Sequence, residues 1–191
     1  MIYAGQVTPL DPRSNVVPVT TANDVLGGNF LSRINTDLRE TKGWTYGTYG
    51  NLQMTVNAVP YVLQAPVQAD RTADSIVALS KQIRGYLGPN GVTEEELSRT
   101  IAKSTSALPG QFETSGAVLN AMQTNAMFGR PDNYYELLAD RYRSLTRTEI
   151  DTAIRQVIDP NGLVWVVVGD AAKIRPQLEK LKMPIEVMQP R

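Results

Sequence analysis

The spacing of apolar residues divides the chain into short strands and amphipathic helices. Alternating or continuous apolar segments predict strands at 2–7, 45–58, 61–69 and 163–168, with a turn at 57–60. Apolar residues that recur every three or four positions predict helices over 19–42, 73–87, 93–108, 112–128 and 132–143, one that begins at Thr146, and a last one that Pro184 ends. The run 163–168 is the only continuous apolar one, which is typical of a covered central strand.

The order of these elements predicts the fold class. Strands fall at both ends of the chain and near one third of its length, and a block of consecutive helices separates them. A doubly wound fold would instead alternate strands and helices. We therefore expect an α+β fold, an antiparallel sheet with helices packed on one face, in one domain over residues 1–191. The first predicted strand, 2–7, lies at the very start of the given sequence without a preceding turn, which suggests a fragment of a longer protein.

Two features of the first predicted helix bear on packing. Gly27 and Gly28 lie inside it, each at a cost of about 1 kcal/mol relative to Ala, so we expect close packing against a strand to offset this cost. Leu26, Phe30, Ile34 and Leu38 form its apolar stripe, and Gly43 follows Lys42 as a C-terminal cap.

Composition restricts the available chemistry. The 191 residues include 19 Lys and Arg, 19 Asp and Glu, no His and no Cys. Balanced charge lacks the basic excess with which nucleic acids and anionic membranes are bound, and no apolar run reaches the ~20 residues of a membrane span. Without His and Cys the chain has no Ser-His-Asp triad, no His- or Cys-ligated zinc and no disulfide. We expect no catalyst in isolation, no nucleic-acid or membrane partner, and either the periplasm or the cytoplasm as compartment.

One pair of side chains is a candidate for chemistry. Arg39 lies in the last turn of the helix 19–42, and Tyr46 starts the next strand seven residues later. Such a helix–turn–strand corner can direct both side chains to one edge of the sheet. There a guanidinium and a phenol can donate hydrogen bonds to substrate carbonyl oxygens, including one that becomes an oxyanion. By spacing alone the structural alternative is favoured: an Arg at a helix C-terminus and a Tyr at a strand edge.

The segment that contains this pair resembles a signature of the pitrilysin/insulinase family of zinc metallopeptidases. The matching residues are Leu26-Gly27-Gly28, the aromatic Phe30, Ser32-Arg33-Ile34, Leu38-Arg39-Glu40, Gly43 and Tyr46. Residues 108–114 and 167–170 are also similar to the family's pattern. Trp44 stands where the family more often has a smaller apolar residue, and the family's first strand begins a few residues earlier.

The resemblance implies a fold of the metallohydrolase-like α/β roll type and a function. Family members pair homologous domains into a clamshell around a peptide, and a His-x-x-Glu-His domain binds zinc and supplies the general base. This chain resembles the C-terminal, inactive domain. The resemblance therefore implies no cofactor here, zinc in a partner domain or subunit, and a peptide substrate. Arg39 would hold a peptide carbonyl, and Tyr46 would donate to the scissile carbonyl oxygen.

Other roles stay open. The same fold serves as a catalytically inactive scaffold subunit in some family members, and a stand-alone peptide-binding module is a third alternative. The strand after Tyr46 can offer its edge to an extended peptide through main-chain hydrogen bonds. An apolar surface left bare on the isolated domain would favour a homodimer.

Overall fold

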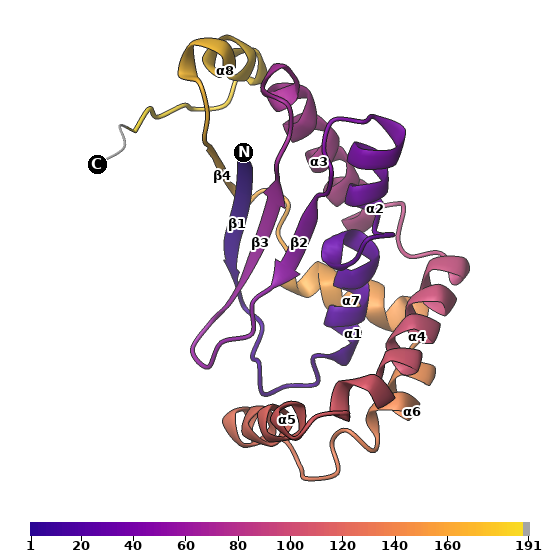
Figure 1. Ribbon diagram of the computed structural model, residues 1–191. Helices are drawn as coiled ribbons and strands as arrows, with labels where there is room; N and C mark the ends of the chain where they lie inside the picture. The colour runs from indigo at the N-terminus through magenta and orange to yellow at the C-terminus, as the bar shows by residue number, and fades with distance from the viewer. Residues whose placement is uncertain (189–191) are drawn as a thin grey trace.

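A four-stranded antiparallel sheet forms one layer of the protein, and helices cover one of its faces (Figure 1). The computed structural model describes residues 1–188. The sheet has the order β2-β3-β1-β4. Its strands are β1 (Ile2–Thr8), β2 (Tyr49–Leu52), β3 (Val59–Ala65) and β4 (Val164–Val167). This architecture confirms the expected α+β fold.

Helices follow one another between β3 and β4, as the apolar spacing predicts. The α-helices are α1 (Val17–Asn23), α2 (Arg33–Asn35), α3 (Thr72–Leu87), α4 (Glu94–Ala107), α5 (Ser115–Phe128), α6 (Leu138–Arg143), α7 (Arg147–Val157) and α8 (Ala171–Leu178). The core lies between the sheet and this helical layer, where Leu26, Leu63, Leu79 and Ile154 are fully buried. In the part of the chain that the structure describes, no helix is long and apolar enough to cross a bilayer.

Side-chain hydrogen bonds cap the starts of two central helices. The Thr93 side chain accepts a hydrogen bond from the Glu96 N–H, and the Glu96 carboxylate accepts from the Thr93 N–H, which completes a capping box at the start of α4. At the start of α7 the Thr146 hydroxyl accepts from the Glu149 N–H. These side chains satisfy N–H groups that have no partner inside a helix.

The prediction of one helix over 19–42 is wrong. After α1 the chain forms a π-helical turn at Asp24–Gly28, and Asn29 is extended, with φ −142° and ψ 173°. A second helical segment then runs through α2 into another π-helical turn, Thr36–Thr41. The break turns Phe30 out of the predicted core stripe, and its side chain is 50% exposed.

Gly27 packs against the sheet, as expected. A methyl group there would lie 2.9 Å from the Gly50 nitrogen in β2 and 2.7 Å from Cδ1 of Ile34. Both distances are shorter than van der Waals contact, so the helix can approach the strand this closely only without a side chain at Gly27. The close approach between this π-helical turn and β2 sets the position of the chain segment that follows.

The strand predicted at 163–168 is not a covered central strand. It forms β4 at the edge of the sheet, where it pairs only with β1. Side chains on one of its faces lack cover within residues 1–188: Val164 is 68% exposed, and Val166 is also exposed. A continuous apolar run therefore forms an edge strand here. The prediction of a covered central strand failed because the sequence does not show whether a second layer covers a strand.

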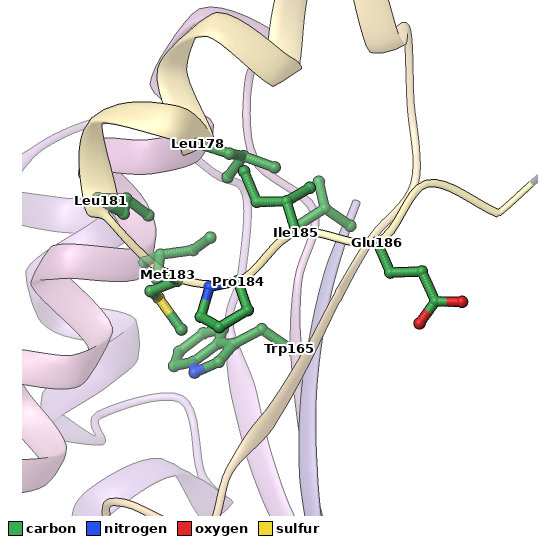
Figure 2. A pocket seen from close by; sticks show the side chains of 9 residues that line it. Trp165, Leu178, Leu181, Met183, Pro184, Ile185 and Glu186 are labelled. Atoms are coloured by element: carbon green, nitrogen blue, oxygen red, sulfur yellow. The ribbon is translucent and has the colours of Figure 1, made fainter.

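The C-terminal segment returns over this edge strand (Figure 2). Trp165, Leu178, Leu181, Met183 and Pro184 line a small apolar pocket between the segment and β4. The predicted tail extends to Arg191, and its last three residues lie outside the described part of the chain. This pocket lacks a cluster of polar groups.

We expect Gly27→Ala to lower the free energy of unfolding by about 1–3 kcal/mol, because the added methyl group would overlap the Gly50 backbone. Chemical denaturation measures the effect. Gly116→Ala in α5 is the matched control: no atom lies within 4 Å of the added carbon, so the same substitution should leave stability unchanged or raise it. Equal stability of Gly27→Ala and the wild-type chain would contradict the packing argument.

Candidate functional site

Arg39 and Tyr46 line one groove of about 550 Å³ at the corner between the second π-helical turn and the sheet. The remaining lining residues are Glu40, Gly43, Trp44, Thr45, Pro66, Val67 and Gln68. Backbone contacts hold the two walls together: Thr45 forms a β-bridge with Val67, and the Gln68 N–H donates to the Trp44 carbonyl at 3.1 Å. The corner thus brings both predicted residues to one surface.

Arg39 projects from the π-helical turn Thr36–Thr41, which Gly43 closes. Gly43 has φ +66°, a left-handed conformation that favours glycine, and its N–H donates to the Arg39 carbonyl at 3.1 Å. The half-buried guanidinium lies 4.3 Å from the centre of the Phe30 ring and 2.9 Å from the Glu40 carboxylate. The contact with Glu40 is an ion pair without hydrogen-bond alignment. Arg39 Nη1 is buried, and it makes no hydrogen bond within residues 1–188.

Tyr46 is the most exposed large side chain of the site, at 98%. The prediction that Tyr46 starts a strand is wrong, because β2 begins only at Tyr49. It lies instead in the loop just after the bridge between Thr45 and Val67. Its hydroxyl has no partner among the described residues, so it is available to a group outside this chain.

A buried amide connects the two loops that border the site. Asn35 is fully buried; its Nδ2 donates to the Phe30 carbonyl at 2.6 Å, and its Oδ1 accepts from the Thr48 N–H at 2.9 Å. One side chain therefore holds the loop that carries Phe30 and the loop that carries Tyr46. No sequence pattern identifies Asn35 as a site residue, because both of its partners are backbone groups.

The outer edge of β2 is already covered at its centre. The Gly50 carbonyl accepts from Asn23 Nδ2 at 2.9 Å, and Gly27 packs on the Gly50 nitrogen. The hypothesis that this strand offers its edge to a peptide therefore does not hold at Gly50. The exposed donors of the site are side chains in the preceding loop.

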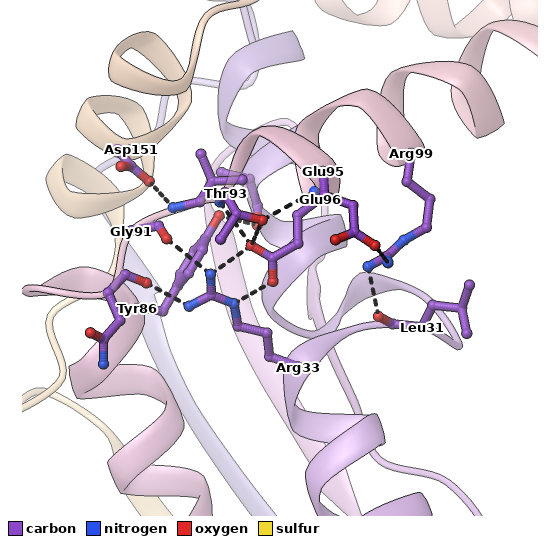
Figure 3. Close-up of polar contacts among 12 residues, drawn as sticks. Leu31, Arg33, Tyr86, Gly91, Thr93, Glu95, Glu96, Arg99 and Asp151 are labelled. Atoms are coloured by element: carbon purple, nitrogen blue, oxygen red, sulfur yellow. Dashed lines mark hydrogen bonds and ion pairs between the residues drawn. The ribbon is translucent and has the colours of Figure 1, made fainter.

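A polar network anchors the start of the helical segment that ends in Arg39 (Figure 3). Arg33 in α2 makes a bidentate pair with Glu96 in α4, with both N···O distances 2.6 Å. Its other bonds go to the Asn90 and Gly91 carbonyls, and its guanidinium lies 4.8 Å from the Tyr86 ring centre. Bidentate pairing fixes orientation as well as distance.

The network changes the acidity of its members. Burial alone would raise the pKa of Glu96, but hydrogen bonds from Arg33 and Thr93 outweigh burial and hold the pKa below its ordinary value. The hydrogen bond to Glu96 raises the pKa of Arg33. Burial raises the pKa of the Tyr86 hydroxyl, which donates to the Ala22 carbonyl at 2.9 Å. All three groups thus keep one protonation state near neutral pH.

The chain's residues do not fit a zinc site. The sequence has no His and no Cys. Among residues 1–188, no three Asp or Glu side chains come together as a cluster that could hold a metal ion. The Arg39 guanidinium and the Tyr46 phenol that line the groove can donate hydrogen bonds to a ligand.

Comparison with known sequences identifies a protein family and a relative that the chain resembles. The family described as "Peptidase M16 inactive domain" matches residues 2–104, more than half of the chain. A Helicobacter pylori protein named "Non-peptidase homolog YmxG" is 26% identical over 151 residues, which are 78% of this chain and 34% of that protein. The chain thus spans about a third of the length of this relative.

Solved structures show the same fold. The peptidase M16 inactive domain from Pseudomonas fluorescens has a TM-score of 0.78 at 19% identity, over 86% of this chain and 39% of that one. A putative zinc protease from Bordetella pertussis Tohama I has a TM-score of 0.71 at 17% identity, over 88% of this chain and 94% of that one. At these identities the likeness concerns the fold alone.

We expect Glu96→Gln to lower the free energy of unfolding at pH 7 by about 2 kcal/mol, because it removes the charged partner of the half-buried Arg33. A lowered pKa stabilises the folded state above the unfolded value near 4.5, and this contribution disappears as the pH falls through the folded value. The difference between wild type and variant should therefore shrink below about pH 4.5.

Denaturation curves from pH 7 to pH 3 measure this difference. Glu95→Gln is the matched control: the neighbouring Glu95 side chain is 89% exposed, so its substitution should change stability little at any pH. A difference between wild type and Glu96→Gln that stays constant with pH would contradict the role assigned to the ion pair.

Proposed function

The chain belongs to the family of peptidase M16 inactive domains, and we propose that it supplies the part of a peptide-substrate site that does not bind zinc. In this proposal a domain or subunit with a His-x-x-Glu-His motif faces the groove, and the peptide lies between the two. Arg39 and Tyr46 are the residues of this chain that contact the peptide.

One observation carries the proposal: two side chains with hydrogen-bond donors border one groove, Tyr46 at 98% exposure and Arg39, whose Nη1 pairs with the Glu40 carboxylate as an ion pair but makes no hydrogen bond within residues 1–188. Native structures rarely leave the donors of a half-buried Arg without a partner. The backbone that carries both residues is held by the bridge at Thr45 and by the Asn35 amide. A fixed frame with unpaired donors is suited to bind an acceptor that arrives from outside.

Each side chain has a distinct role in peptide hydrolysis. Tyr46 donates to the scissile carbonyl oxygen as negative charge develops there, which stabilises the transition state more than the ground state. Arg39 donates to a neighbouring peptide carbonyl and fixes the register of the chain. Carbonyl oxygens are common to all peptides, so these contacts select an extended backbone and not a particular side chain.

Zinc belongs to the partner in this account. The catalytic metal of such an enzyme would polarise a bound water molecule. The roles of Arg39 and Tyr46 require no contact with it.

A scaffold role is the second candidate, and the name "Non-peptidase homolog" of the Helicobacter pylori relative favours it. Under this alternative, the native gene product recovered with its bound partners contains no His-x-x-Glu-His segment by mass spectrometry. Under the proposed function such a segment is found, in the same polypeptide or in a co-purifying one.

In the enzyme assembled with its His-x-x-Glu-His partner, we expect Tyr46→Phe to lower kcat by about 100-fold or more, as for the loss of one oxyanion donor. The free energy of unfolding should not change, because the hydroxyl is exposed and unpaired. Steady-state kinetics and denaturation of the same preparations measure both. Tyr49→Phe, in β2 and outside the groove, is the matched control and should keep full turnover. Equal kcat for Tyr46→Phe and wild type would refute the assignment.

A further inference from the structure

We propose that Phe30 is a positioning residue that holds the Arg39 guanidinium in the orientation in which it meets the peptide. The inference rests on the proposed function and adds a residue to it. Phe30 does not line the groove, so it acts on substrate only through Arg39.

The geometry places Phe30 behind the cation. Its ring centre lies 4.3 Å from Cζ of Arg39, within the range in which a guanidinium stacks on an aromatic face. Arg side chains have high rotamer entropy, and Arg39 Nη1 makes no hydrogen bond to residues 1–188 that would limit this one. The ring and the Glu40 carboxylate, 2.9 Å from Arg39 Nη1, are thus the groups that restrict the guanidinium.

The loop that carries Phe30 is itself held in place. Asn29 Nδ2 donates to the Asp24 carbonyl at 2.7 Å, and Asn29 Oδ1 accepts from the Leu31 N–H at 2.8 Å. The Phe30 carbonyl accepts from the buried Asn35 side chain at 2.6 Å. A large apolar ring that is half exposed on a fixed loop gains little from burial. Its position is instead explained by the cation above it.

The stacking itself occupies none of the N–H groups of Arg39. An aromatic face restricts the plane of a guanidinium without using any of its five donors. The Glu40 carboxylate, 2.9 Å from Nη1, partly neutralises the charge of Arg39, whereas the Phe30 ring leaves that charge unchanged. An aromatic support therefore suits an Arg whose donors serve a substrate carbonyl.

The test compares Phe30→Leu, which removes the ring but keeps an apolar side chain, with Phe30→Tyr, which keeps the ring. Leu31→Ala is the matched control, since Leu31 is the next residue and is also exposed. Thermal unfolding first verifies that each variant folds, as expected for exposed positions. The first readout is the 15N order parameter of the Arg39 Nε–H in the 191-residue chain. The second is KM and kcat of the assembled enzyme, with Arg39→Ala measured in parallel.

We expect the order parameter to fall below about 0.6 in Phe30→Leu and to stay at the wild-type value in Phe30→Tyr and Leu31→Ala. KM should rise about fivefold in Phe30→Leu with kcat nearly unchanged, and Phe30→Tyr should restore it. An unchanged order parameter in Phe30→Leu overturns the inference.

The two proposals can fail separately. If Phe30→Leu mobilises Arg39 and only Arg39→Ala raises KM, the positioning role is refuted and the proposed function stands. If neither variant changes KM, Arg39 does not bind substrate, and both proposals are overturned.

Discussion

The arrangement of the groove depends on one buried side-chain amide. Asn35 joins the Phe30 carbonyl to the Thr48 N–H, two backbone groups that are 18 positions apart in the sequence and that no strand or helix pairs. An unpaired buried N–H or C=O costs about 1–3 kcal/mol, so the two loops are stable together only with this amide between them. The positions of the Phe30 and Thr48 backbones beside the groove follow from that constraint.

Two further contacts extend the frame on either side of Asn35. Gly27 lets the first π-helical turn approach the Gly50 backbone, and the bidentate pair of Arg33 with Glu96 joins α2 to α4. The Asn35 amide and the Arg33–Glu96 pair in this frame have hydrogen-bond partners for their polar groups. Of the donors that it carries, Tyr46 is exposed and Arg39 Nη1 makes no hydrogen bond within residues 1–188, which is the distribution expected of a surface that completes a site with a second domain.

The sequence was sufficient for the parts of the fold that local rules determine. Thr93 and Glu96 cap α4 because the capping box acts within one turn, and Gly27 indicated a close contact because glycine in a helix needs a compensating gain. Co-location of Arg39 and Tyr46 followed from their spacing around the Gly43 turn. The prediction that Val164 lies in a covered strand is wrong, because apolar character does not show how many faces of a strand are packed.

The role of Asn35 and the exposure of Phe30 depend on the tertiary structure. Asn29 ends the first π-helical turn through its own side-chain hydrogen bonds, which compete with helix continuation and which periodicity does not register. The apolar stripe that includes Leu38 therefore continues in the sequence while the backbone turns Phe30 outward. Only the folded positions of the two loops identify Asn35 as the residue between them.

Hydrogen exchange at the Thr48 amide tests this constraint most directly, in the wild-type chain and in Asn35→Ala. The account predicts slow exchange at Thr48 in the wild type and exchange about 30-fold faster in the variant, equivalent to about 2 kcal/mol, with the amides of β3 unchanged. A Thr48 amide that exchanges in the wild type as fast as the exposed Tyr46 amide would contradict the claim that Asn35 holds the site together.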